Sequence, residues 1–214
     1  LEVIAHVSQE AKDRLERYLQ ETRITVGAAQ TDHVLDIEVT VSKGDSRAVV
    51  RAVNEHTNLV YIEKDGQVLE ERPIEKQEDP DAPDYTLLNV ADICEFARTC
   101  DLSDVSAILD RQIACNTAVA EEGLRGNYGA NVGSTLLKAY GTDIKIRAKA
   151  RAAAGSDARM SGCELPVVIN SGSGNQGLTV SLPVIEYARE LGSSQEELYR
   201  ALTLSNLVTL HAKE

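Results

Sequence analysis

The hydrophobic pattern of this chain changes its period at an acidic, proline-rich stretch. Before this stretch, Leu35, Ile37, Val39 and Val41 alternate with polar residues, as in a half-buried strand. Residues 73–84 then hold three prolines and several acidic side chains, a composition that disfavours any packed element. From Tyr85 onward, apolar residues recur at three- and four-residue spacing, as in helices. A strand-like period followed by a helical period predicts a sheet-containing part and a separate helical part.

The first part predicts a small domain of one helix and an antiparallel sheet. Ile4 to Tyr18 carry apolar residues at helical spacing. The Asp65-Gly66 pair favours a tight turn between strands 59–63 and 67–71. Further strands are predicted over residues 35–42, 47–53 and 24–28. We expect the helix to pack on one face of this sheet.

The second part predicts helices over residues 87–98, 103–122, 133–140, 142–154, 178–189 and 195–212. The fold class expected is therefore α+β. It comprises a small domain over residues 1–72, a connector over residues 73–84, and a mainly helical domain over residues 85–214.

Composition narrows the classes of function. The formal net charge of −12 disfavours a nucleic-acid or anionic-membrane surface. We find neither an apolar run long enough for a bilayer nor a secretory leader, so we expect a cytoplasmic protein. The chain opens directly in a helical pattern at Leu1 and stops within another at Glu214, so we expect a piece of a longer polypeptide.

The cysteines do not predict a metal centre within this chain. Cys94 and Cys100 are six residues apart, and Cys115 and Cys163 stand alone, so no close pair exists. Reduced, mostly buried cysteines are expected instead.

A glycine-rich string, Asn170-Ser-Gly-Ser-Gly-Asn-Gln-Gly177, follows the apolar run 165–169, which resembles a strand. A turn of this kind that opens a helix exposes backbone N–H groups at the positive end of the helix dipole, where they can hold an anion. The spacing also satisfies the dinucleotide-binding pattern. That alternative lacks the second strand and the ribose-binding acid, and Pro183 interrupts the helix.

Two further elements are candidate ligand-binding segments. Asp157 and Arg159 would diverge on a helix but could converge on the glycine-rich string from a non-helical turn, where the arginine fork would receive a carboxylate. The alternative is a capping aspartate beside a solvated arginine. In the small domain, His56 and Asn58 lie in a polar turn whose residues are equally typical of local backbone hydrogen bonding.

Residues 155–160, together with the string 170–177, closely resemble the L-cysteine desulfidase family, which is related to the alpha chain of iron–sulfur L-serine dehydratases. His56-Thr57-Asn58 and Cys115 fit the same pattern, and the resemblance covers essentially the whole chain. It implies β-elimination from L-cysteine, giving pyruvate, ammonia and hydrogen sulfide, or from L-serine, giving pyruvate and ammonia. It also implies a [4Fe–4S] cluster that acts as a Lewis acid.

The chain departs from this family in ways that bear on the cluster. The Gly-Cys-Thr-Glu-Pro element of the family has no counterpart here. The cysteines that bind the cluster in the family would lie beyond the point that matches Glu214. We therefore expect the chain to match the middle of an enzyme roughly twice as long. No cluster is expected in this chain, and no activity from it alone.

The resemblance leads to a set of expected site residues and partners. Ser173 and Asn175 would bind the substrate carboxylate or amino group. The full set expected to bind substrate is His56, Asn58, Asp157, Arg159, Ser171, Gly172, Ser173, Gly174, Asn175, Gln176 and Gly177. No catalytic residue is assigned. The expected partners are a small amino acid and the remaining segments of the longer chain, with a homo-oligomer left open. The competing function is a non-catalytic amino-acid-binding module.

Overall fold

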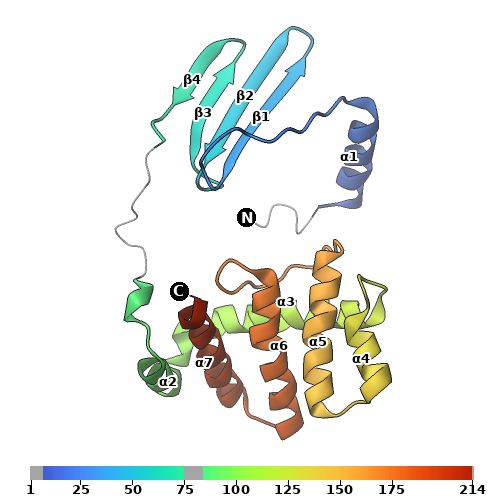
Figure 1. Ribbon diagram of the computed structural model, residues 1–214, viewed down its shortest axis with the longest axis vertical. Helices are drawn as coiled ribbons and strands as arrows, with labels where there is room; N and C mark the ends of the chain where they lie inside the picture. Colours follow the sequence, from blue (N-terminus) through green and yellow to red (C-terminus); the bar gives the residue numbers. More distant parts are fainter. Residues whose placement is uncertain (1–6, 75–83, 214) are drawn as a thin grey trace. The chain divides into compact units, whose positions relative to one another are not determined.

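The computed structural model describes residues 7–74 and 84–213. The chain contains two compact units, a small unit over Gln9–Pro83 and a helical unit that includes Asp84–Glu214 (Figure 1). The predicted α+β class is confirmed, because one unit contains an antiparallel sheet and the other is built of helices. The predicted connector, residues 73–84, lies largely outside the described residues.

The small unit is a four-stranded antiparallel meander preceded by a helix. Helix α1 spans Gln9–Glu21. The strands follow in the order β1-β2-β3-β4 and are β1 (Asp36–Lys43), β2 (Ser46–Val53), β3 (Leu59–Lys64) and β4 (Gln67–Glu71). Asp65 and Gly66 both have positive φ, at 52° and 81°, as the predicted two-residue turn requires.

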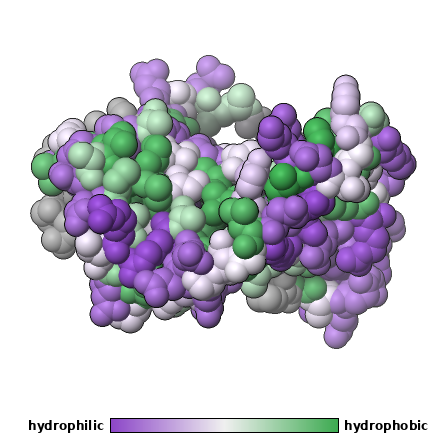
Figure 2. All heavy atoms as spheres, turned by 90° about the horizontal axis from the view of Figure 1, so that it is seen from below, coloured by the Kyte–Doolittle hydropathy of each residue, from purple (hydrophilic) through white to green (hydrophobic). Residues whose placement is uncertain are grey.

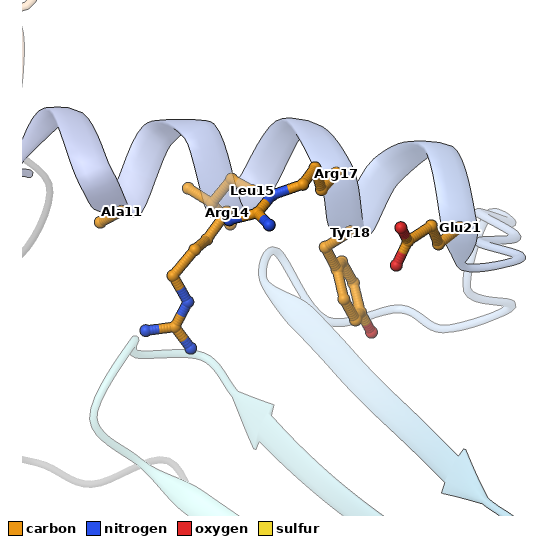
Figure 3. A pocket seen from close by; sticks show the side chains of 6 residues that line it. All are labelled: Ala11, Arg14, Leu15, Arg17, Tyr18 and Glu21. Atoms are coloured by element: carbon orange, nitrogen blue, oxygen red, sulfur yellow. The ribbon is translucent and has the colours of Figure 1, made fainter.

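The burial of this sheet differs from the expectation. Val49, Val53 and Val60 are buried, but the alternating face of β1 is open, with Val39 and Val41 each 54% exposed. Helix α1 buries none of its residues, so the predicted packing of helix on sheet is wrong. An open hollow of about 600 Å³ lies along α1, and Figure 3 shows Arg14 and Tyr18 extending from the helix across it. Residues 24–28, predicted as a strand, are irregular.

Asp36 of β1 and Arg51 of β2 form a bidentate ion pair that makes the stability of the sheet sensitive to acid. Arg51 Nε and Nη2 donate to the two Asp36 carboxylate oxygens at 2.8 and 2.6 Å, and the Asp36 side chain is 4% exposed. These hydrogen bonds lower the pKa of the Asp36 carboxyl from 3.8 to about 2.

We therefore predict a pH window for the contribution of Asp36 to stability. A lowered folded-state pKa gives stability that is complete above the unfolded pKa of 3.8 and is lost as the pH falls toward about 2. Urea unfolding of the small unit, followed by its β-sheet circular dichroism at pH 7, 4 and 2.5, should show Asp36→Asn less stable than the parent at pH 7. The gap should shrink at pH 2.5, and a constant gap would contradict the assignment.

Within residues 84–213, the helical unit contains six α-helices. They are α2 (Val90–Thr99), α3 (Ser106–Arg125), α4 (Val132–Tyr140), α5 (Ile144–Met160), α6 (Gly174–Leu191) and α7 (Gln195–Lys213). Short 3-10 turns at Tyr85–Leu87 and Leu102–Asp104 precede α2 and α3. Helices α4, α5, α6 and α7 stand side by side, and α3 crosses them (Figure 1). None of the described helices is long and apolar enough to cross a membrane.

Small residues let these helices approach closely. A Cβ at Gly123 of α3 would lie 2.1 Å from the carbonyl oxygen of Ala154 in α5, and one at Gly133 of α4 would lie 2.4 Å from that of Ala150. The core beside these crossings includes Val119, Ala120, Ala152, Ala158, Leu178 and Leu182. Helix α5 therefore forms the centre of the unit, and its carboxyl end leads to the glycine-rich string.

Candidate functional site: an anion cradle at the start of α6

The glycine-rich string begins with a two-residue turn. The backbone groups of Asn170 and Ser173 exchange two hydrogen bonds of 3.1 and 2.9 Å around Ser171 and Gly172. Both central residues have positive φ, 47° and 74°, which glycine adopts freely and serine only at a cost. The preceding residues 165–169 form no strand, and Leu165 lies in a bend, so that part of the prediction is wrong.

Helix α6 starts directly after this turn, with Ser173 as its N-cap. The Ser173 hydroxyl accepts a hydrogen bond of 3.3 Å from the backbone N–H of Gln176, and its carbonyl accepts one of 3.0 Å from that of Gly177. The N–H groups of Gly174 and Asn175 belong to the first turn, where a helix provides no partner. With the helix dipole behind them, they can receive an anion.

Arg159 places its guanidinium group against this helix start. Arg159 Nη1 lies 3.2 Å from Asn175 Oδ1 and 3.3 Å from the sulfur of Met160. A Cβ added to Gly174 would lie only 2.2 Å from Arg159 Nε, so the glycine makes room for the arginine. Arg159 therefore contacts the helix start from the last turn of α5, and not from the non-helical turn that was predicted.

Arg159 differs from the arginines that are already neutralised in the unit. Arg147, Arg151 and Arg189 surround the buried Glu186, with the Arg151 Nε to Glu186 Oε1 distance at 2.7 Å. The described hydrogen bonds of Arg159 go instead to neutral atoms, which leaves its charge available to a ligand. A second cation reaches the turn from α7, where the Lys213 ammonium donates to the carbonyl oxygen of Ser171.

Asp157 points to a different part of the unit. Helix α5 continues through Met160, so the non-helical turn that would let Asp157 and Arg159 converge does not exist. Asp157 Oδ2 accepts a hydrogen bond of 2.7 Å from the backbone N–H of Val132, at the start of α4. Its place in the substrate site stays a prediction that this geometry does not support.

A chain of hydrogen-bonded side-chain amides connects the turn to α3 and α7, and sequence reasoning did not predict it. Gln112 of α3 and Asn206 of α7 exchange hydrogen bonds of 3.0 and 2.9 Å. Asn206 Oδ1 also accepts a bond of 3.0 Å from Asn170, whose own Oδ1 accepts one of 3.1 Å from Gln176. The positions of Asn170 and Gln176 are therefore fixed from two helices that are remote in sequence.

Asn116 anchors the segment before the turn, residues 165–169. Its Oδ1 accepts a hydrogen bond of 2.9 Å from the N–H of Val168, and its Nδ2 lies 3.2 Å from the carbonyl oxygen of Val168 and 3.1 Å from that of Gly177. Asn116 is fully buried. The available sequence signal was the pair Gln112 and Asn116, two amides four residues apart within a buried helix face.

His56 and Asn58 lie in the small unit. Asn58 Nδ2 donates to the carbonyl oxygen of Val53 at 2.9 Å, which is the local backbone bonding that a polar turn needs. Asn54 opens this turn with a φ of 66°, and His56 is exposed. Their place in a substrate site stays a prediction.

The four cysteines are free and partly buried. Over residues 7–74 and 84–213, no three His, Cys, Asp or Glu side chains gather closely enough to hold a metal ion. Tyr128, in the turn before α4, donates to Glu122 at 3.1 Å, and this bond raises the pKa of the Tyr128 hydroxyl.

Comparison with known proteins assigns the chain to a family. A family model described as the serine dehydratase alpha chain matches residues 1–214. The chain belongs to the serine dehydratase alpha-chain family.

Curated relatives of the chain are longer than the chain itself. A UPF0597 protein of Desulfitobacterium hafniense is 55% identical over the whole chain and 50% of its own length. UPF0597 proteins of Lachnoclostridium phytofermentans and Treponema denticola are 51% and 40% identical, each over the whole chain and 51% of the relative. The chain thus spans about half the length of these relatives. No solved structure matches it.

Proposed function

We propose that this chain supplies the carboxylate-binding part of the active site of a lyase that catalyses β-elimination from L-cysteine or L-serine. The observation that carries the proposal is the Arg159 guanidinium over Gly174, beside the free N–H groups of the first turn of α6. Membership of the serine dehydratase alpha-chain family supports lyase chemistry on a small amino acid. The preference between cysteine and serine is left to the experiment.

The residues of this chain would bind and orient the substrate. The carboxylate would accept hydrogen bonds from the N–H groups of Gly174 and Asn175 and pair with Arg159, a receptor built for a planar anion. Ser173 and Asn175 would contribute side-chain hydrogen bonds to the carboxylate or the amino group. Fixing the carboxylate also fixes the α- and β-carbons, between which the double bond must form as proton and leaving group depart.

A [4Fe–4S] cluster would supply Lewis-acid chemistry to such a reaction. The described residues do not fit this group, because no three possible ligands among them gather. We propose that the cluster ligands belong to parts of the longer enzyme outside this segment.

The proposal predicts a selective defect when Arg159 is changed. A chimera in which this chain replaces the matching half of the Desulfitobacterium hafniense relative is expected to release pyruvate from L-cysteine or L-serine. Arg159→Ala should raise KM by about 10- to 100-fold, because a charge-assisted hydrogen bond contributes roughly 1.5–3 kcal/mol. The melting temperature should stay nearly unchanged, since Arg159 is exposed. An unchanged KM with a large fall in melting temperature would leave Arg159 a structural role only.

Two companion variants sharpen this test. Arg159→Lys retains the charge but not the fork, so it should recover only part of the lost affinity. Gly174→Ala places a methyl group where Arg159 Nε now lies, and the flexible arginine can move away. It should therefore raise KM while the helix stays folded.

The competing function, a non-catalytic amino-acid-binding module, is supported by one observation. The cradle is assembled within the helical unit, from α5, α6 and α7, without requiring residues of the small unit. Calorimetric titration of the isolated chain with L-cysteine and L-serine separates the two functions. Tight binding by the chain alone would favour the module, and binding only in the chimera favours the lyase.

A further inference from the structure

An apolar groove lies beside the glycine-rich turn, between α2, α3, α7 and residues 168–171. It has a volume of about 260 Å³. Its rim is formed by Phe96, Ile108 and Ile169, which are 46, 61 and 54% exposed. Figure 2 shows one face of the molecule, on which hydrophobic residues gather in patches between hydrophilic ones. Side chains of this size are seldom left together in water without a partner.

The chemistry of the groove selects an apolar occupant. None of its lining residues is charged. The polar groups at its floor, Gln112, Asn170 and Asn206, are hydrogen-bonded to one another, and the Thr203 hydroxyl donates to the carbonyl oxygen of Tyr199 at 2.9 Å. An occupant gains little by offering hydrogen bonds here, and a charged one would lose its hydration without compensation. The groove is thus unsuited to the amino-acid substrate.

We propose that this groove seats an apolar segment from the part of the longer family chain that the present chain does not match. The relatives carry about as many further residues as the chain itself, since the match covers half of each. A groove of about 260 Å³ holds only a few side chains. A separate protein would need about 1,200 Å² or more of buried surface for a stable complex.

A covalently joined segment escapes that requirement. Its effective concentration is in the millimolar range for a short linker, so a small apolar contact is sufficient. Because Ile169 and Ser171 belong both to the groove and to the approach to the turn, the seated segment would also shield one side of the cradle from water. The inference concerns packing and does not depend on the reaction assigned to the cradle.

Methyl NMR of the isolated 214-residue chain tests the proposal. The probes are overlapping peptides of about 20 residues from the unmatched half of the Desulfitobacterium hafniense relative. At millimolar concentration, which matches the effective concentration of a tethered segment, at least one apolar peptide should shift the methyl signals of Ile108, Ile169 and Leu207 saturably. Ile108→Asp and Phe96→Asp should each weaken that binding at least tenfold. Tyr140→Asp is the control, because this α4 residue is 70% exposed and lies away from the groove, so binding should not change.

Three outcomes would overturn the proposal. The first is that no peptide shifts the groove methyl groups, or that Ile108→Asp and Phe96→Asp leave the shifts intact. The second is that dilution of the chain alone moves these signals, which would identify a second copy as the occupant. The third is that L-cysteine or L-serine moves the signals of Ile108 in α3 and Leu207 in α7, which would make the groove a substrate pocket. The lyase proposal would survive the first two results, because neither involves the cradle.

Discussion

Replacing Asn116 by leucine is expected to destabilise the helical unit by about 3–5 kcal/mol, because the change strands several buried polar groups at once. The side chain has no exposed surface and holds both backbone groups of Val168 and the carbonyl oxygen of Gly177. Leucine branches at the same side-chain atom but is larger and offers no hydrogen bonds, so the N–H of Val168 loses its acceptor. Each buried group left unsatisfied costs about 1–3 kcal/mol. Urea unfolding followed by helical circular dichroism measures the loss.

The matched control is Thr117→Val, at the next position of the same helix. The Thr117 hydroxyl is buried and has no hydrogen-bond partner among the described residues. Removing an unpaired buried hydroxyl should leave stability unchanged or raise it by about 1 kcal/mol. If the two variants lost similar amounts, the cost would come from altered packing in α3 and not from the amide.

Local patterns predicted most of the fold because the helices carry their own periodicity. Each of the six predicted helices of the second part is present, and the Asp65-Gly66 turn joins β3 and β4 as expected. Burial was harder to predict, because an alternating apolar pattern marks which face of a strand is apolar but not which element covers that face. The apolar face of β1 is regular in sequence yet open in the structure, and α1 does not cover it.

The glycines show why helix ends were misplaced. Gly155 was expected to end α5, but it lies inside the helix, where Leu178 packs 3.3 Å from the position of an added Cβ. In the string, only Gly172 has positive φ among the glycines. Gly174 and Gly177 are helical and are needed for close approach, so α6 begins four residues earlier than its predicted start at Leu178. A glycine required for packing and one required for a turn look the same in sequence.

The candidate site was predictable where it depends on neighbouring residues and not where it depends on distant ones. The helix start and Arg159 belong to two short motifs, residues 170–177 and 155–160, that lie close together in the sequence. Asn206 lies 94 residues from Gln112, so no local pattern could pair them. Asp157 was misplaced for a related reason, since its partner at the start of α4 is 25 residues away. Long-range contacts of this kind decide which polar residues position the turn and which only cap helices.

The close approach at Gly177 leads to the second large expected effect. Gly177→Ala should destabilise the helical unit by about 3 kcal/mol or more, although alanine in a helix interior is normally favoured over glycine by about 1 kcal/mol. The new Cβ would lie 2.1 Å from the carbonyl oxygen of Val168 and 2.9 Å from the Cα of Ile169. Both are backbone atoms, and neither can turn aside as a flexible side chain can.

The accommodation of this Cβ would disturb the site itself. Helix α6 and the segment before the turn would have to separate, and Asn116 bonds to both, at Gly177 and at Val168. Thermal unfolding and the methyl NMR signals of Val168 and Ile169 report the two effects, stability and position. We expect both to change in Gly177→Ala.

Gly174→Ala provides the contrast, because it adds the same methyl group to the same helix, three residues earlier. Its Cβ meets only the side chain of Arg159 within 3.0 Å, so the arginine can move and the free energy of unfolding should change by no more than about 1 kcal/mol. The two alanine variants thus separate two roles of the glycines. Gly177 allows α6 to pack against the segment before the turn, and Gly174 allows the Arg159 guanidinium to lie over the anion cradle. Equal losses of stability in both variants would show that Arg159 is held as rigidly as the backbone. The Arg159 side chain would then be a fixed part of the packing and not a group that can move to meet a ligand.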